Sequence, residues 1–289
     1  MSDNKKYTKN YFEKTQSSYD IIWMNRKNLA MHYGFWGSGI RNLNGALLNE
    51  NKVTATKLGL KKGDIVLDAG CGVGGSSIWM AENYGVKVTG ITIVDKQVKL
   101  ARKYAQDRGV DSLVCFENMD YCNTKFSDES FDKIFAMESM CYAQDKSIFL
   151  KEMYRVLKPG GTLVIADAFL DGRVLTKKDK LQLNDWLEGW AIPNIVILKD
   201  FFEYLDANSF VGLDDEDVKS LIMPSAKRIY NIGRIFFPFD WTCNKLRLLS
   251  DTTFKSTISS LSQYRLFSEG IMQYHLIKVE KKGDVKNNR

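Results

Sequence analysis

Short runs of β-branched and apolar residues alternate with longer amphipathic stretches from residue 64 onward. This alternation predicts an α/β fold, because parallel strands need helix-length connections that cross over and cover the sheet. Helices are expected over 76–84, 96–109 and 145–157, and the stop signal Lys158-Pro-Gly-Gly161 ends the last of them. Strands are expected at Ile65–Asp68, Val86–Ile91, Leu113–Glu117, Lys133–Met137 and Gly161–Ala168.

The pattern changes after residue 168. Two further strands, at about Phe210–Lys219 and Tyr274–Glu280, are separated by stretches that predict helical or irregular insertions. We therefore divide the chain into a helical N-terminal cap at 1–60, a core at 61–170, an insertion at 171–196, a core helix and strand at 197–220, a helical insertion at 221–268, and a last strand with a basic tail at 269–289.

The composition is that of a folded protein. Hydrophobic residues make up 44% of the 289 residues and proline occurs only 4 times, which excludes a mainly disordered chain. Lys plus Arg outnumber Asp plus Glu by 41 to 35, but much of the excess lies at the two ends rather than on a basic face with interleaved aromatic residues. Nucleic acid is therefore not an expected partner, although the basic ends would allow weak contact with a membrane surface.

The remaining composition bears on location and metal binding. No apolar run approaches the roughly 20 residues that a transmembrane helix needs, and no apolar leader follows the first methionine, so the expected location is cytoplasmic. The five cysteines form no CxxC pair, and the two histidines, His32 and His275, lie far apart. We therefore expect free thiols, with neither a disulfide framework nor a metal site.

A glycine-rich turn follows the first strand of the predicted core. The stretch Val66-Leu-Asp-Ala-Gly-Cys-Gly-Val-Gly-Gly75 leads from a strand into a helix. Its glycines let the backbone approach a ligand closely, beside the unpaired N–H groups of the helix start. The carboxylate of Asp68 would repel a pyrophosphate but can accept hydrogen bonds from an ammonium group, which favours an amino-acid ligand over a dinucleotide.

The stretch Asp68-Ala-Gly-Cys-Gly-Val-Gly74 resembles the first motif of class I S-adenosylmethionine-dependent methyltransferases. Further motifs of that family follow in order, and the resemblance extends from about Tyr19 to Lys281. It implies a Rossmann-like fold with a mostly parallel seven-stranded sheet, helices on both faces and helical lid insertions. It also implies S-adenosylmethionine as cofactor, S-adenosylhomocysteine as product, and a cofactor loop made of Asp68, Gly70, Cys71, Gly72 and Gly74.

The later motifs resemble other parts of the cofactor site. Many members carry an acid after the second strand to hold the ribose, whereas this chain has Thr92-Ile93. It resembles a subgroup in which a glutamine of the next helix, here Gln97, helps to hold the ribose. Asp120 would accept a hydrogen bond from the adenine amino group, and Tyr121 would pack on or near the adenine ring. Glu138, just past the fourth strand, faces the same cleft, because ligands bind beyond the carboxyl ends of parallel strands.

The N-terminal segment resembles that of small-molecule methyltransferases of the γ-tocopherol, sterol, geranyl diphosphate, and sarcosine or dimethylglycine types. In those relatives this segment folds over the cofactor. The resemblance therefore makes Tyr19 a cofactor contact and His32 a lid and catalytic residue. The alternative is that Tyr33, Phe35 and Trp36 only pack in the core and that His32 is only a cap.

Methyl transfer is an in-line displacement that needs alignment and exclusion of water, with a base only where the acceptor must lose a proton. Several relatives carry a histidine where this chain has Tyr142. A phenol has a pKa of about 10, so Tyr142 argues against base-driven O-methylation. It favours C- or N-methylation, in which aromatic faces and Glu138 would stabilise positive charge and act in catalysis.

Apolar and aromatic side chains are dense in the two insertions and suggest the roof of a pocket for a lipophilic molecule. The alternative is that they bury the insertions against the sheet or form a dimer contact. The side chains that we expect to contact the substrate are Trp36, Tyr142, Trp186, Trp190, Met223 and Phe237.

These features together predict an enzyme that methylates a small, lipophilic molecule such as an isoprenoid, quinone, sterol or natural product, as a monomer or homodimer. The alternatives are a small-amine N-methyltransferase, a natural-product O-methyltransferase, and a cofactor-binding module without transferase activity. A nucleic-acid methyltransferase is not favoured, since Met137-Glu-Ser-Met-Cys-Tyr142 lacks the Asn/Asp-Pro-Pro-aromatic signature.

Overall fold

The computed structural model describes residues 3–22 and 28–283, without the side chains of 3–4 and 16–22. Its strands are β1 Ile65–Ala69, β2 Lys87–Thr92, β3 Val114–Asn118, β4 Phe131–Met137, β5 Leu157–Leu170, β6 Phe210–Asp217 and β7 Met272–Lys281. Its helices are α1 Asp3–Ile22, α2 Leu43–Leu58, α3 Gly75–Tyr84, α4 Asp95–Arg108, α5 Lys146–Val156, α6 Lys177–Gly189, α7 Leu198–Ala207, α8 Lys219–Lys245 and α9 Asp251–Ser268, with a 3₁₀ turn at Met140–Tyr142.

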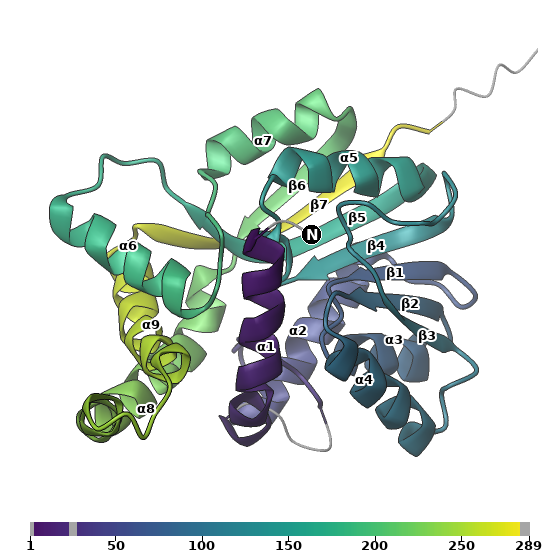
Figure 1. The fold of residues 1–289 in the computed structure, drawn as a ribbon. Coiled ribbons are helices and arrows are strands. Elements are labelled where there is room, and N and C mark those ends of the chain that lie inside the picture. Colours follow the sequence, from purple (N-terminus) through teal and green to yellow (C-terminus); the bar gives the residue numbers. More distant parts are fainter. Residues whose placement is uncertain (1–2, 23–27, 284–289) are drawn as a thin grey trace, which may run out of the picture.

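The seven strands form one sheet in the order β3-β2-β1-β4-β5-β7-β6. Strands β1 to β5 are parallel to one another, and β7 is antiparallel to both β5 and β6. The predicted mostly parallel, seven-stranded Rossmann-like sheet is therefore confirmed (Figure 1). The chain builds outward from β1 in one direction and then crosses to β4 on its other side. The carboxyl ends of β1 and β4 are thus a topological switch point, where open α/β sheets bind ligands.

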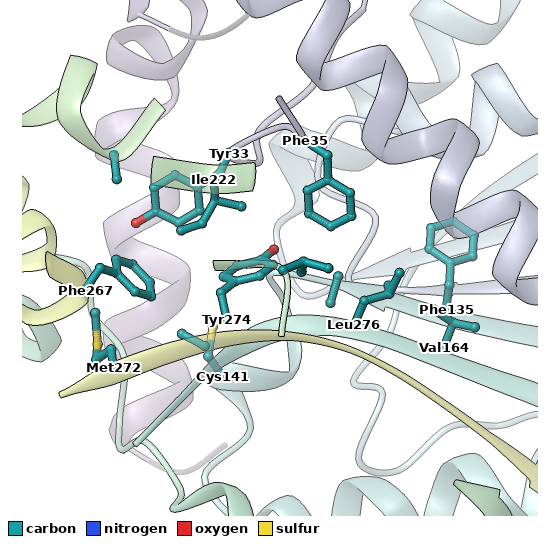
Figure 2. Packing of buried hydrophobic residues seen from close by; sticks show 14 of the residues in the cluster. Tyr33, Phe35, Phe135, Cys141, Val164, Ile222, Phe267, Met272, Tyr274 and Leu276 are labelled. Carbon is teal, nitrogen blue, oxygen red and sulfur yellow. The ribbon is translucent and has the colours of Figure 1, made fainter. Parts of the chain in front are cut away.

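The two faces of the sheet carry separate cores, because successive side chains of a strand point to opposite faces. In β4, Phe135 joins the cluster under α2 and α3, whereas Ile134 and Ala136 join the cluster under α5 and α7. Figure 2 shows the first of these clusters, with Tyr274 of β7 surrounded by aromatic rings. The ring centroids of Tyr33 and Phe35 lie 6.0 Å and 6.3 Å from that of Tyr274.

Helices α6, α8 and α9 form a group beside the sheet, at the lower left of Figure 1. Helix α9 packs between α6 and α8. The approach of α6 to α9 requires glycine, because a Cβ at Gly189 would lie 2.2 Å from the Lys255 carbonyl oxygen. Helix α8 is continuous over 27 residues although Pro224 and Pro238 lie within it. Helices α6 and α9 lie within the segments predicted as insertions at 171–196 and 221–268, whereas α8 begins at Lys219, two residues before the second segment.

All five cysteines lie in the described part of the chain, and all five are free thiols. Among residues 3–22 and 28–283, no helix has the length and apolarity to cross a bilayer. Within the same ranges, no three His, Cys, Asp or Glu side chains are grouped as a metal site would need.

Candidate active site

A cavity of about 470 Å³ lies beyond the carboxyl ends of β1, β2 and β4. The glycine turn after β1 lines one end of the cavity, and helices α8 and α9 line the other. Glu138, Tyr142 and Trp190 lie on its wall, together with Phe12 and other side chains of α1. One continuous space therefore joins the glycine turn to the helical insertions.

The glycine turn has a backbone that other residues would not allow. Gly70 has φ +103°, and a Cβ there would lie 2.4 Å from the Cβ of Ser139. Gly70, Cys71 and Gly72 all line the cavity. Gly74 does not line it and instead caps α3 with φ +82°, where a Cβ would meet the Phe116 ring at 2.5 Å. Gly74 therefore shapes the turn without touching the cavity wall.

Asp68 is a buried carboxylate at the end of β1, and it lines the cavity. Its Oδ2 accepts a hydrogen bond of 2.6 Å from the Ser77 hydroxyl. Burial raises the pKa of Asp68 to about 7. No Lys or Arg side chain among the described residues forms an ion pair with it, so a cationic group brought by a ligand would be its counterion.

Thr92, Ile93 and Gln97 meet at the carboxyl end of β2 and line the cavity. The buried Thr92 hydroxyl donates to Gln97 Oε1 over 2.8 Å. The hydroxyl also accepts a hydrogen bond from the Val94 amide at 3.3 Å. The side chains of the strand end and the next helix are therefore held together, and the predicted role of Thr92, Ile93 and Gln97 in holding the ribose stays a prediction.

Asp120 and Tyr121 follow β3 on the same edge of the sheet and also line the cavity. Asp120 Oδ1 accepts from the Cys122 amide at 2.9 Å, and its Oδ2 forms an ion pair with Lys5 of α1. The Tyr121 hydroxyl donates to the Ser139 carbonyl oxygen at 2.8 Å. The Lys5 contact was not predicted, because no sequence pattern links residues 5 and 120.

Glu138 lies directly after β4 in an uncommon backbone conformation, with φ +49°. Its Oε1 accepts from the Tyr33 amide at 2.7 Å and from the Tyr274 hydroxyl at 3.0 Å. The Tyr274 hydroxyl also lies 3.3 Å from Glu50 Oε1. Burial, reinforced by the nearby charge of Glu50, raises the pKa of Glu138 well above its ordinary value. Two carboxyl groups, of Glu138 and Glu50, therefore share the Tyr274 hydroxyl.

His32 is held by a buried carboxylate of α2. Its Nδ1 lies 2.6 Å from Glu50 Oε2, which also accepts from the Gly34 amide at 2.8 Å. His32 lines the cavity, and its buried Nε2 has no hydrogen-bond partner among the described residues. Glu50 was missed, although the helical phase of buried Ala46 and Thr54 places position 50 on the same face of α2.

Tyr142 occupies the 3₁₀ turn after β4 and contacts Phe12 of α1, with ring centroids 5.2 Å apart. The turn is fixed from beneath by the buried ammonium of Lys146. This group donates to the carbonyl oxygens of Cys141 at 3.0 Å and Ala143 at 2.8 Å. The carboxylate of Asp167 accepts from the Cys141 amide at 2.9 Å. Tyr142 is thus placed on the cavity wall by a rigid support.

The structure does not bring together all the side chains predicted to contact the substrate. Tyr142 and Trp190 line the cavity, but Trp36, Trp186, Met223 and Phe237 do not. Trp36 donates to Ser225 over 2.8 Å, Trp186 is buried against Trp190, Met223 packs against the core, and Phe237 packs on Phe254. Tyr19 lies on α1, and its side chain is outside the described part of the structure.

The phase of α8 decides which of its side chains face the cavity. The cavity-lining residues on α8 are Ile229, Ile232, Gly233, Phe236 and Asp240. Their spacing of three, four, seven and eleven residues marks one face of a helix. Phe237 is one position out of phase with Phe236 and therefore points elsewhere. The facing wall comes from α9 and is rich in hydroxyl groups, from Thr253, Ser256, Thr257 and Ser260.

Comparison with known proteins supplies a family. A family model described as a methyltransferase domain matches residues 67–165. The O-methyltransferase cnsE of Penicillium expansum is 31% identical over 199 residues, which are 68% of this chain and 71% of that protein. The chain belongs to the class I S-adenosylmethionine-dependent methyltransferases. The chain is also similar to 2-methyl-6-phytyl-1,4-hydroquinone methyltransferase of Synechocystis sp. The two are 38% identical over 162 residues, which are 53% of this chain and 48% of that protein.

The methyltransferase chain thus spans about half the length of that second relative. Its fold is similar to that of solved structures. Geranyl diphosphate C-methyltransferase from Streptomyces coelicolor has a TM-score of 0.73 at 19% identity, over 97% of this chain and 98% of that chain. The [4+2]-cyclase SpnF has a TM-score of 0.76 at 23% identity, over 95% of each chain. At these identities the likeness concerns the fold alone.

Proposed function

We propose that this protein transfers a methyl group from S-adenosylmethionine to a small, mainly apolar acceptor, with carbon as the favoured acceptor atom. The observation that carries the proposal is the single cavity that runs from the glycine turn, past Glu138 and Tyr142, to the apolar side chains of Ile229, Ile232 and Phe236. The hydroquinone methyltransferase relative, whose name includes a phytyl chain, supports an acceptor of this kind.

The chain's own residues fit the cofactor. The buried Asp68, which lacks a Lys or Arg partner among the described residues, would accept a hydrogen bond from the cofactor's ammonium group. Glycine is required at position 70 of the turn, where a Cβ would clash with Ser139. Thr92 and Gln97 would hold the ribose hydroxyls. Asp120 would accept a hydrogen bond from the adenine amino group. For this, its Oδ2 must give up the ion pair with Lys5.

The bound cofactor supplies a methyl group on a cationic sulfur, which is transferred by in-line displacement. The walls of the cavity would align the acceptor and exclude water. When a carbon atom of a double bond accepts the methyl group, the acceptor molecule becomes a cation and then loses a proton. Glu138, as a carboxylate, would stabilise that charge and take the proton, because it lines the cavity and its raised pKa makes it a stronger proton acceptor. The ring of Tyr142 would face the same charge.

His32 favours a second candidate function, O-methylation of a hydroxyl group. The bond from Nδ1 to Glu50 would orient the ring, and the unpartnered Nε2 could take a proton from a hydroxyl in the cavity. The relative cnsE is named as an O-methyltransferase. In this case His32, and not Tyr142, would be the base that deprotonates the acceptor.

The test is to incubate the protein with methyl-labelled S-adenosylmethionine and extracts of its source cells, and to partition the label. The expected result is label in the organic-soluble fraction, absent when Asp68→Asn replaces the wild type. Loss of label in His32→Gln with retention in Glu138→Gln would favour O-methylation. Label in the polar fraction would favour a small amine. Label on macromolecules would overturn the acceptor class, and cofactor binding without label on any extract would favour a binding module.

A further inference from the structure

The second half of α8 and the turn after it carry an exposed apolar surface. We name residues 234–248 the α8 tip. The structure describes 14 large apolar side chains as exposed, and six of them lie in this short stretch. Leu248 is 76% exposed, Ile235 73% and Phe239 66%, and Phe236, Trp241 and Leu246 complete the set. A cluster of this kind on the surface of a protein marks an interaction site.

The α8 tip also carries positive charge. Arg234, Lys245 and Arg247 are exposed beside the apolar side chains. The tip contains one acid, Asp240, which accepts a hydrogen bond of 2.6 Å from the Thr257 hydroxyl. The tip therefore combines aromatic and aliphatic side chains with a net charge of 3 − 1 = +2. This combination is typical of helices that lie in the interface of an anionic membrane.

The cavity reaches the α8 tip. Phe236 is 53% exposed and lines the cavity. Asp240 of the tip also lines the cavity, and so do Thr253 and Thr257 on the facing part of α9. In Figure 1 the ends of α8 and α9 lie at the lower left, away from the strands of the sheet.

We propose that the α8 tip docks on an anionic lipid bilayer and that a lipophilic acceptor passes from the bilayer along Phe236 into the cavity. The docking step rests only on the tip itself, and the passage of an acceptor rests on the proposed function. A second copy of the chain fits the tip less well, because a twofold contact would bring Arg234, Lys245 and Arg247 close to the same cations of the partner.

The test is co-sedimentation of the full chain with vesicles of phosphatidylcholine alone and of phosphatidylcholine mixed with phosphatidylglycerol, without cofactor or acceptor. Binding is expected only where the anionic lipid is present. The double variant Phe239→Ser with Trp241→Ser should weaken partitioning by about tenfold or more. Lys245→Gln with Arg247→Gln should weaken it by about fivefold for each cation removed.

The matched control is Val174→Ser, which removes a side chain that is 95% exposed but distant in sequence from the tip and should leave binding unchanged. Brominated lipids should quench the fluorescence of wild-type Trp241, measured as the difference from Trp241→Phe, so that the test does not depend on the fold of the serine variants. Failure to bind any vesicle, or equal binding by all variants, would overturn the proposal. A dimer in solution that Phe239→Ser dissociates would also overturn it. None of these results depends on methyl transfer, so loss of the proposed function would be recognised separately.

Discussion

The replacement Asp68→Asn tests the cofactor site and its electrostatics together. Asn keeps an oxygen that can accept the 2.6 Å hydrogen bond from Ser77, but it removes the charge. Burial raises the pKa of Asp68 from 3.8 to about 7. Ionising this side chain in the folded protein at pH 8 therefore costs about 4 kcal/mol, at about 1.4 kcal/mol for each pKa unit. The variant should be more stable than the cofactor-free wild type by up to this amount.

The sign of the pH dependence follows from the raised pKa. Between about pH 4 and pH 7 the folded wild type keeps a proton on Asp68 that the unfolded chain has lost. The wild type therefore loses stability as pH rises through this window, whereas Asp68→Asn does not titrate there. Urea unfolding at pH 5 and pH 8 should show a stability difference that grows with pH. The control Asp107→Asn, at an exposed acid paired with Lys103, should change stability by less than about 0.5 kcal/mol at either pH.

Calorimetry completes the test of Asp68. The same replacement should weaken S-adenosylmethionine binding by about 100-fold or more, because the buried acceptor for an ammonium group loses its charge. Stabilisation without loss of affinity would mean that the carboxylate is buried but does not bind the cofactor. A stability difference that is independent of pH would show that the pKa of Asp68 is not raised, and the electrostatic reasoning would then be wrong.

Four further outcomes can be measured. Cofactor affinity of the wild type should fall by up to about tenfold for each pH unit below 7, as Asp68 becomes protonated, and calorimetry across this range checks it. Glu138→Gln should lower turnover by about 100-fold with little change in cofactor affinity, and unchanged turnover would exclude the proton transfer. Tyr142→Leu, which removes the aromatic ring that would face the positive charge, should lower turnover by about tenfold, and equal turnover would leave the ring without a role. Lys146→Met leaves the buried carbonyl oxygens of Cys141 and Ala143, and two part-buried oxygens of Asn194, without their donor. It should cost roughly 2–4 kcal/mol in urea unfolding, whereas exposed Lys151→Met should cost less than about 0.5 kcal/mol.

The features predicted correctly from the sequence depend on local patterns. Strand and helix positions follow from periodicities of two and about 3.6 residues, which can be found in a short window. Parallel strands bring their carboxyl ends to one edge of the sheet. For this reason the turn at Gly70 and the side chains of Thr92, Asp120 and Glu138 were expected near one another, and all four residues line the same cavity.

The features that could not be predicted depend on contacts between distant segments. The ion pair of Lys5 with Asp120 joins residues 115 positions apart, and the hydrogen bond of Tyr274 to Glu50 spans 224. The choice of Phe236 over Phe237 depends on the phase of α8. Prolines usually end or kink a helix, so a continuous helix through Pro238, with a single phase, is not expected from the sequence.

The two halves of the cavity also differ in whether local patterns or contacts between distant segments build them. The half that we propose for the cofactor, the cofactor half, is made by strand ends and the glycine turn, where a change at Gly70 would meet Ser139 and a change at Asp68 would alter a buried charge. The half that we propose for the acceptor is made by one face of α8 and one face of α9, outside the sheet. Replacements at Ile232 or Phe236 can reshape that half without touching the cofactor half. A single fold can therefore keep its cofactor while its acceptor changes, which explains why local motifs indicate the cofactor but not the acceptor.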